Sequence, residues 1–158
     1  RNVYGTGHGH NLFQVHLLIP MLLVGPGIDP AEVDDNVSQL DVLPTLLDAA
    51  GLSVPPVDGR SLLGSLDPHR PVVSEAVAYG HDKASVVLGD LKLLSSPGDR
   101  YERAFRLGPD RRESSAVDDQ EVMAGLRRHL PAAPAVVGQQ VVATGEIERH
   151  LRGLGYIE

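Results

Sequence analysis

The sequence predicts an α/β fold, in which the end of a large, mostly parallel sheet with helices precedes a small antiparallel-sheet subdomain with a C-terminal helix. Three observations predict it. A continuous apolar run at 19–24 is typical of a strand buried on both faces. Leucines recur at helical spacing within 38–51. From 71 to 109, short apolar runs alternate with closely spaced glycine and proline turns, as in an antiparallel meander.

Composition limits the classes of function. The 158 residues include 14 basic and 21 acidic side chains, a net charge of −7, and 42% of them are hydrophobic, which suits a globular chain. An acidic balance with 4% aromatic residues does not favour a nucleic-acid partner. Because the chain has no cysteine, disulfides, thiolate metal sites and a cysteine nucleophile within it are excluded, while its compartment stays open.

The first third of the chain is the acidic part. Residues 1–58 hold one basic and seven acidic side chains. This pattern fits either cation binding or an ordinary solvated surface, and we favour the surface. The acids at 29–35 lack the spacing of an EF-hand calcium loop.

A helix is expected to begin after Ser38. Asp41 stands three residues later, which is the spacing of a capping box. Pro44 predicts a kink or a fresh start, because proline is costly deep inside a helix, and Gly51 suits the left-handed residue at the C-terminal end.

The second half of the chain predicts a small sheet and closing helices. An acidic start and a basic end favour a helix over 118–130, because such charges complement the helix dipole. A proline- and alanine-rich stretch at 131–135 is typical of a linker, and a last helix is expected at 146–154. The expected strands are 72–78, 84–88, 91–94 and 104–107.

One strand cannot form a sheet by itself, because its backbone groups and both of its apolar faces need neighbours. We therefore expect this chain to be a C-terminal piece whose partner is the missing N-terminal part of its own catalytic domain. The expected units are 1–66 in the catalytic domain, 71–130 as the small subdomain, and 131–158 as linker and tail. The longest apolar stretch, 17–24, is too short for a membrane span, so no membrane partner is expected.

Several motifs resemble the C-terminal part of the sulfatase family, within the alkaline-phosphatase-like superfamily. The resemblance covers almost the whole chain. It is carried by GHGHNLF at 7–13, IPMLLVGPG at 19–27, VSQLDVLPTLLDAAGL at 37–52, DGRSL at 58–62 and EIERHLRGLGY at 146–156.

The resemblance implies hydrolysis of a sulfate ester on a small molecule or a glycan. In this family the nucleophile is a formylglycine made from Cys or Ser, and a divalent cation, usually calcium, is held by Asp and Asn or His side chains. The nucleophile motif is absent here, so we expect the nucleophile and the metal ligands upstream of this fragment, with no metal ligand within it. The first lysine of the chain is Lys83, so the resemblance assigns no sulfate-contacting lysine to this sequence.

His8 and His10 are the candidate catalytic residues, and His10 and Asn11 are the candidate substrate-binding residues. Two imidazoles in a glycine-rich loop can donate hydrogen bonds to a sulfate oxygen or protonate a leaving alcohol near neutral pH. The alternatives are metal ligation, or hydrogen bonds to backbone groups that shape the loop. His16, within an apolar run, is expected to be a core histidine.

Two other functions remain open from the sequence. The first is hydrolysis of a phosphodiester or phosphonate ester in the same superfamily, with a Thr or Ser nucleophile and two metal ions. The second is a non-catalytic domain that binds a partner through the exposed face of its antiparallel sheet.

Overall fold

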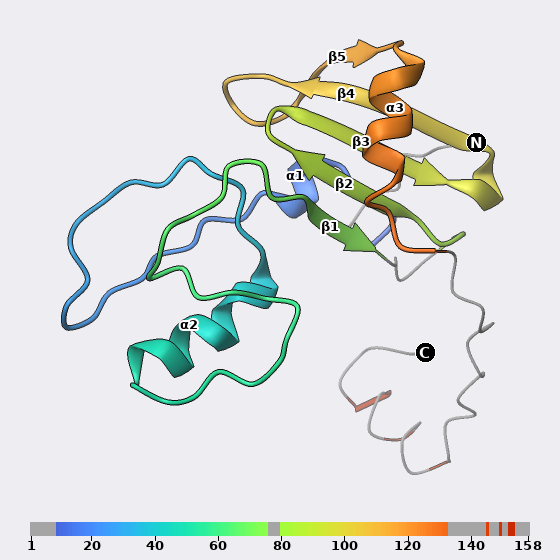
Figure 1. Cartoon of the computed structure of the whole chain (residues 1–158). Coiled ribbons are helices and arrows are strands. Elements are labelled where there is room, and N and C mark those ends of the chain that lie inside the picture. The colour runs from blue at the N-terminus through green and yellow to red at the C-terminus, as the bar shows by residue number, and fades with distance from the viewer. Residues whose placement is uncertain (1–8, 76–79, 133–144, 146–148, 150–151, 154–158) are drawn as a thin grey trace.

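The computed structural model describes residues 9–75 and 80–132, together with 145, 149, 152 and 153 (Figure 1). The chain has an α/β fold built on one five-stranded antiparallel sheet, in the order β1-β2-β3-β4-β5. The strands are β1 Val72–Glu75, β2 Ala84–Leu88, β3 Leu91–Ser96, β4 Tyr101–Leu107 and β5 Glu113–Val117. The helices are α1 Gln14–Leu17, α2 Val42–Ala49 and α3 Gln120–Arg127, with short 3₁₀ turns η1 Gln39–Asp41 and η2 Pro97–Asp99.

The antiparallel meander predicted from the turn residues is confirmed. Leu88 pairs with Leu91 across a two-residue turn, where Gly89 has a φ of 59°. A positive φ at this place is what a tight hairpin needs, and glycine adopts it without strain. β4 begins at Tyr101, three residues before the expected position, and pairs with β3 along its length.

The fifth strand was not expected. Three of its five residues are Glu113, Ser114 and Ser115, so it lacks the apolar alternation by which a strand is predicted. It lies at one edge of the sheet and pairs only with β4, across a register shift between Arg106 and Leu107. Such a polar edge strand is stabilised by its backbone pairing more than by apolar burial.

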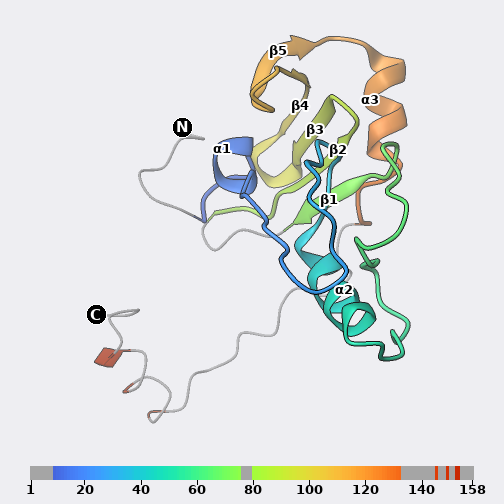
Figure 2. The same cartoon turned by 90° about the vertical axis from the view of Figure 1, so that its left-hand side faces the viewer.

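The main core lies between the sheet and α3. Met123 and Leu126 of the helix pack on Val86, Leu93 and Ala104 of the three central strands. Figure 2 shows α3 on one face of the sheet and α1 on the opposite face. Because β2 and β3 carry buried side chains on both faces, the sheet is the middle layer of the structure.

The helix predicted at 118–130 is confirmed as α3, which starts later, at Gln120, and ends earlier, at Arg127. Its N-cap is Asp119, whose Oδ1 accepts hydrogen bonds from the backbone N–H groups of Glu121 and Val122 at 2.9 and 3.1 Å. These bonds satisfy N–H groups that have no partner within the helix.

The start of the helix expected after Ser38 is confirmed, although the leucines of this helix, α2, are not buried. Ser38 and Asp41 form the expected capping box, η1 precedes α2, and Pro44 lies in the first turn of α2, where a missing N–H costs little. Gly51 has a φ of 67° and follows the helix end. However, Leu43 and Leu46 are exposed, and the buried side of α2 is formed by Pro44 and Thr45.

The expected buried strand at 19–24 is wrong for this structure. These residues form no strand, and Leu22 and Val24 are 88% and 82% exposed. The physical reason is the one that the sequence already suggested, since a strand with two apolar faces needs a strand beside it and helices over both faces. The only described sheet is complete without this stretch.

Some predicted segments lie outside the described residues. They are 76–78 of the first strand, 133–135 of the linker, and most of the helix predicted at 146–154. Among the described residues, no helix is long and apolar enough to cross a membrane.

Candidate functional site

The glycine-rich loop continues into α1, and the structure describes it from Gly9 onward. His8 lies outside the described residues. Gly9 has a φ of 80°, His10 is half-buried, and Asn11 is buried at 6% exposure. Asn11 Oδ1 accepts a hydrogen bond of 3.1 Å from the N–H of Phe13. This local bond shows that Asn11 at least helps to shape the loop.

The segment 11–14, which follows His10 directly, is packed on the sheet face opposite α3. Asn11, Leu12 and Gln14 are buried, and Phe13 is half-buried. The ring of Phe13 meets the ring of Phe105 in β4 edge to face, with centroids 6.1 Å apart. Such an aromatic pair stabilises by about 0.5–1.5 kcal/mol beyond the area that it buries.

A fully buried lysine joins this segment to the sheet. Lys92 of β3 has 0% exposure, and its Nζ donates to the carbonyl oxygen of Leu12 at 2.6 Å, to Gln14 Oε1 at 3.1 Å and to Glu113 Oε1 at 2.8 Å. The same Glu113 oxygen accepts from the backbone N–H of Gln14 at 2.9 Å. Three acceptors match the three hydrogens of an ammonium group.

The environment of Lys92 acts on its charge in two directions. Burial lowers the pKa of Lys92 below its usual 10.5, because the charged form loses its hydration. The carboxylate of Glu113 acts in the opposite sense and favours the ammonium form. The net shift of the pKa is downward, and the three acceptors at Nζ are the set that the ammonium form requires.

A second network is centred on the carboxylate of Asp41. It has no solvent exposure and accepts from the N–H of Ser38 at 2.8 Å, from the N–H of Arg60 at 2.9 Å and from Arg70 Nη1 at 2.8 Å. Thr45 Oγ1 in turn accepts from the N–H of Leu62 at 3.0 Å. The network holds the 58–62 segment against η1 and the start of α2.

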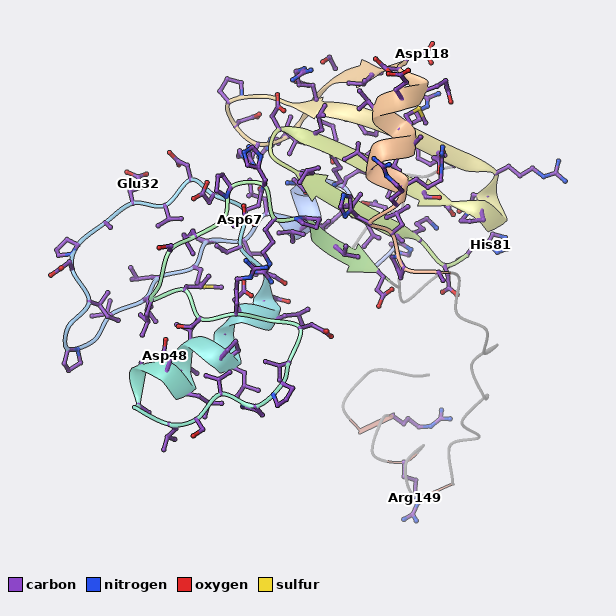
Figure 3. All side chains as sticks on the ribbon, in the orientation of Figure 1. Glu32, Asp48, Asp67, His81, Asp118 and Arg149 are labelled. Atoms are coloured by element: carbon purple, nitrogen blue, oxygen red, sulfur yellow. The ribbon has the colours of Figure 1, made fainter. Side chains whose placement is uncertain are left out.

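The acidic side chains of the first third do not converge. Figure 3 shows Glu32 on the outer loop and Asp48 on α2, well separated from each other. Within the described ranges, no three His, Cys, Asp or Glu side chains are grouped so that they could hold a metal ion. A divalent-cation site would therefore need ligands in addition to those of the described residues.

The structure corrects the expectation for one residue, His16, and adds two residues, Glu113 and Lys92, that the sequence analysis did not select. His16 is exposed on α1, so it is no core histidine; the short helix turns it away from the sheet. Glu113, which the sequence does not mark as a site residue, is paired with buried Lys92 at 2.8 Å. One feature of the sequence could have indicated Lys92, because this lysine interrupts an apolar run within the expected strand 91–94, and the structure buries that strand on both faces.

Part of the chain is similar in sequence to known proteins. It is 40% identical over 74 residues to arylsulfatase K of Mus musculus, covering 39% of this chain and 13% of that protein. It is 37% identical over 75 residues to choline-sulfatase of Rhizobium meliloti (43% and 15%), and 32% identical over 74 residues to arylsulfatase K of Homo sapiens (39% and 14%). The matched stretch thus spans 13–15% of the length of these curated relatives. No protein-family model matches the chain.

Proposed function

Since the chain is related in sequence to the C-terminal part of sulfatases, we propose that the protein to which it belongs hydrolyses a sulfate ester. The observation that supports this is the identity of 37–40% over about 75 residues with two sulfatases. Their names specify different esters, an aryl sulfate and choline sulfate. What the relatives have in common is the sulfate ester and not the alcohol, so the proposal names the ester alone.

The proposed nucleophile is a formylglycine outside these 158 residues. The chain contains no cysteine from which it could form, and none of its serines stands in an SxPxR motif. In the proposed reaction a hydroxyl of the hydrated aldehyde attacks sulfur, the bond between sulfur and the alcohol oxygen breaks, and the leaving alcohol takes a proton. A divalent cation, for which calcium is the expected ion, would stabilise charge on the sulfate oxygens from ligands outside this chain.

The proposed contribution of the described residues is the loop with His10 and Asn11. His10 is half-exposed, which suits contact with an ester, whereas Asn11 is buried and bonded to the backbone of Phe13. We therefore assign to His10 the proton for the leaving alcohol or a hydrogen bond to sulfate. Asn11 would keep the loop in shape beside it.

The exposed apolar side chains favour a partner surface formed by the rest of a catalytic domain. Leu18, Ile19, Leu22 and Val24 lie in the irregular stretch after α1, while Leu40, Leu43 and Leu46 lie on η1 and α2, and all are at least half exposed. Large apolar side chains exposed in such number are typical of a surface that contacts other protein. In the proposed enzyme the upstream part of the catalytic domain covers them.

A substrate comparison with the full-length protein tests the function. We expect hydrolysis of 4-nitrophenyl sulfate, with loss of turnover after chelation and its return with calcium. Bis(4-nitrophenyl) phosphate should be cleaved far more slowly. Preferential cleavage of the phosphate diester would establish the phosphodiesterase instead. Cleavage of neither the diester nor 4-nitrophenyl sulfate nor choline sulfate would overturn an ester hydrolase of this kind.

Replacing His10 tests the site. His10→Gln is expected to lower kcat for 4-nitrophenyl sulfate by about 10- to 100-fold, because the imidazole no longer donates a proton or a hydrogen bond to the oxygen on which charge develops in the transition state. His16→Gln is the matched control, since His16 is exposed on the adjacent helix α1. Steady-state kinetics across pH measure both variants, and equal kcat values for them would remove His10 from the site.

A further inference from the structure

Lys92 is a charged side chain that the fold buries completely. It is the second residue of β3, between half-buried Leu91 and buried Leu93, and its ammonium has no exposure. Burying an ion without partners is strongly unfavourable. All three of its hydrogen bonds go to the segment after the candidate loop or to β5, and none goes to solvent-facing groups.

The bonds of Lys92 connect regions that are distant in sequence. Its acceptors on Leu12 and Gln14 are 80 and 78 residues away. Glu113 closes the arrangement, since one of its oxygens accepts from both Lys92 Nζ at 2.8 Å and Gln14 N at 2.9 Å. The segment is therefore held at a backbone carbonyl, a backbone N–H and a side chain at once.

The held segment is adjacent to the candidate site residues. Only Asn11 separates His10 from Leu12, whose carbonyl oxygen makes the 2.6 Å bond to Lys92 Nζ. The Phe13–Phe105 contact fixes the next residue on the same sheet face. A shift of this segment would therefore move His10 as well.

We propose that Lys92 is a positioning residue for the candidate site: its buried ammonium holds the segment 11–14 against the sheet and thereby places His10. This inference rests on the proposed function, because it assigns catalytic value to the place of His10. A misplacement of about 1 Å by a distant residue can cost on the order of 100-fold in rate. The small antiparallel sheet would then be part of the catalytic apparatus, although it contributes no group that touches the substrate.

The test compares two lysine variants of the full-length protein. Lys92→Met keeps the length and apolar stem but removes the ammonium. Lys83→Met is the matched control, because Lys83 is also buried, at 8% exposure, and pairs with Asp99 at 3.0 Å without touching the segment 11–14. The readouts are kcat and KM for 4-nitrophenyl sulfate, and hydrogen exchange of the amides of Gln14, His16 and Leu18.

For Lys92→Met we expect kcat to fall by about 10- to 100-fold with KM changed by less than about threefold, because binding groups elsewhere remain while the chemistry is misplaced. Exchange of the three amides should accelerate by about tenfold, because their opening is local. Lys83→Met should leave kcat and these exchange rates at the wild-type values. A fall in kcat of similar size in both variants would show a general loss of stability and overturn the proposal.

A double variant separates position from stability. In Lys92→Met the carboxylate of Glu113 is left without its cation, which destabilises the fold. Lys92→Met with Glu113→Gln removes that charge while the Gln oxygen still accepts from Gln14 N, so the unfolding midpoint should recover. The bond to the Leu12 carbonyl stays absent, and kcat should remain low; recovery of kcat together with stability would overturn the positioning role.

The exchange measurement keeps this inference distinct from the proposed function. If the wild-type protein hydrolyses no sulfate ester, the proposed function fails. The exchange rates of the three amides still decide whether Lys92 holds the segment. Unchanged rates in Lys92→Met would overturn the inference whatever the activity.

Discussion

Replacing Asp41 with alanine is expected to lower the free energy of unfolding by about 3–5 kcal/mol, the usual cost of removing one member of a buried ion pair. Its carboxylate is unexposed and receives bonds from two backbone N–H groups and from Arg70, whose side chain is 11% exposed. Without it, three donors lose their acceptor and the guanidinium is left almost buried and unpaired. Urea unfolding of the full-length protein measures the change.

Asp48→Ala is the control for this experiment. Asp48 lies in α2, the helix that Asp41 precedes, and accepts from the hydroxyl of Ser61, but it is exposed. An exposed interaction of this kind is expected to contribute less than about 1 kcal/mol. Equal effects of the two substitutions would contradict the assignment of Asp41 as the anchor of the start of α2.

Asp41 also predicts how stability depends on pH. Burial by itself raises the pKa of Asp41, but the bonds from Arg60, Ser38 and Arg70 outweigh it, so the pKa lies below the usual 3.8. A folded-state pKa below the unfolded one gives stability that is present above about pH 3.8 and is lost as the pH falls through the folded value. The difference in unfolding midpoint between wild type and Asp41→Asn should therefore shrink below pH 3.8.

Gly59→Ala is expected to destabilise the protein by about 3 kcal/mol, at the upper end for overpacking. A Cβ atom at this position would lie 1.9 Å from the carbonyl oxygen of Leu40 and 2.4 Å from its carbon. Backbone atoms at the start of α2 cannot turn aside as a flexible side chain can, so the 58–62 segment would have to move. That movement would also lengthen the bond from Arg60 N to Asp41.

Gly64→Ala is the matched glycine control. A Cβ at Gly64 meets no heavy atom within 4 Å, and its φ is not in the left-handed region. We expect no loss of stability, or a gain of about 0.4–1 kcal/mol from the less flexible unfolded chain. Thermal unfolding of both variants measures the difference, and a Gly59→Ala protein as stable as Gly64→Ala would refute the close approach.

The features that were predicted correctly depend on neighbours in the sequence. The capping box joins Ser38 to a residue three positions on, and the β2–β3 hairpin is set by Gly89 and Asp90. The helix at 120–127 follows from Asp119 and the charges at its ends. Turn and capping energies act over a few residues, so a single sequence contains the information that they need.

The features that were missed depend on distant parts of the chain. The bond from Lys92 to Leu12 spans 80 residues, and β5 is recognisable as a strand only by its pairing with β4. The apolar run at 19–24 has the composition of a buried strand, but composition does not supply the neighbours that bury it.

The α/β class, the antiparallel order of the small sheet, the capped start of α2 and the resemblance to sulfatases can all be predicted from the sequence, because they depend on local energies or on motifs. Which polar residues are buried depends on the tertiary structure. Lys92, Glu113 and Asp41 are ordinary charged residues in the sequence, and a charge becomes structural only when folding removes its water and brings its partners from elsewhere in the chain.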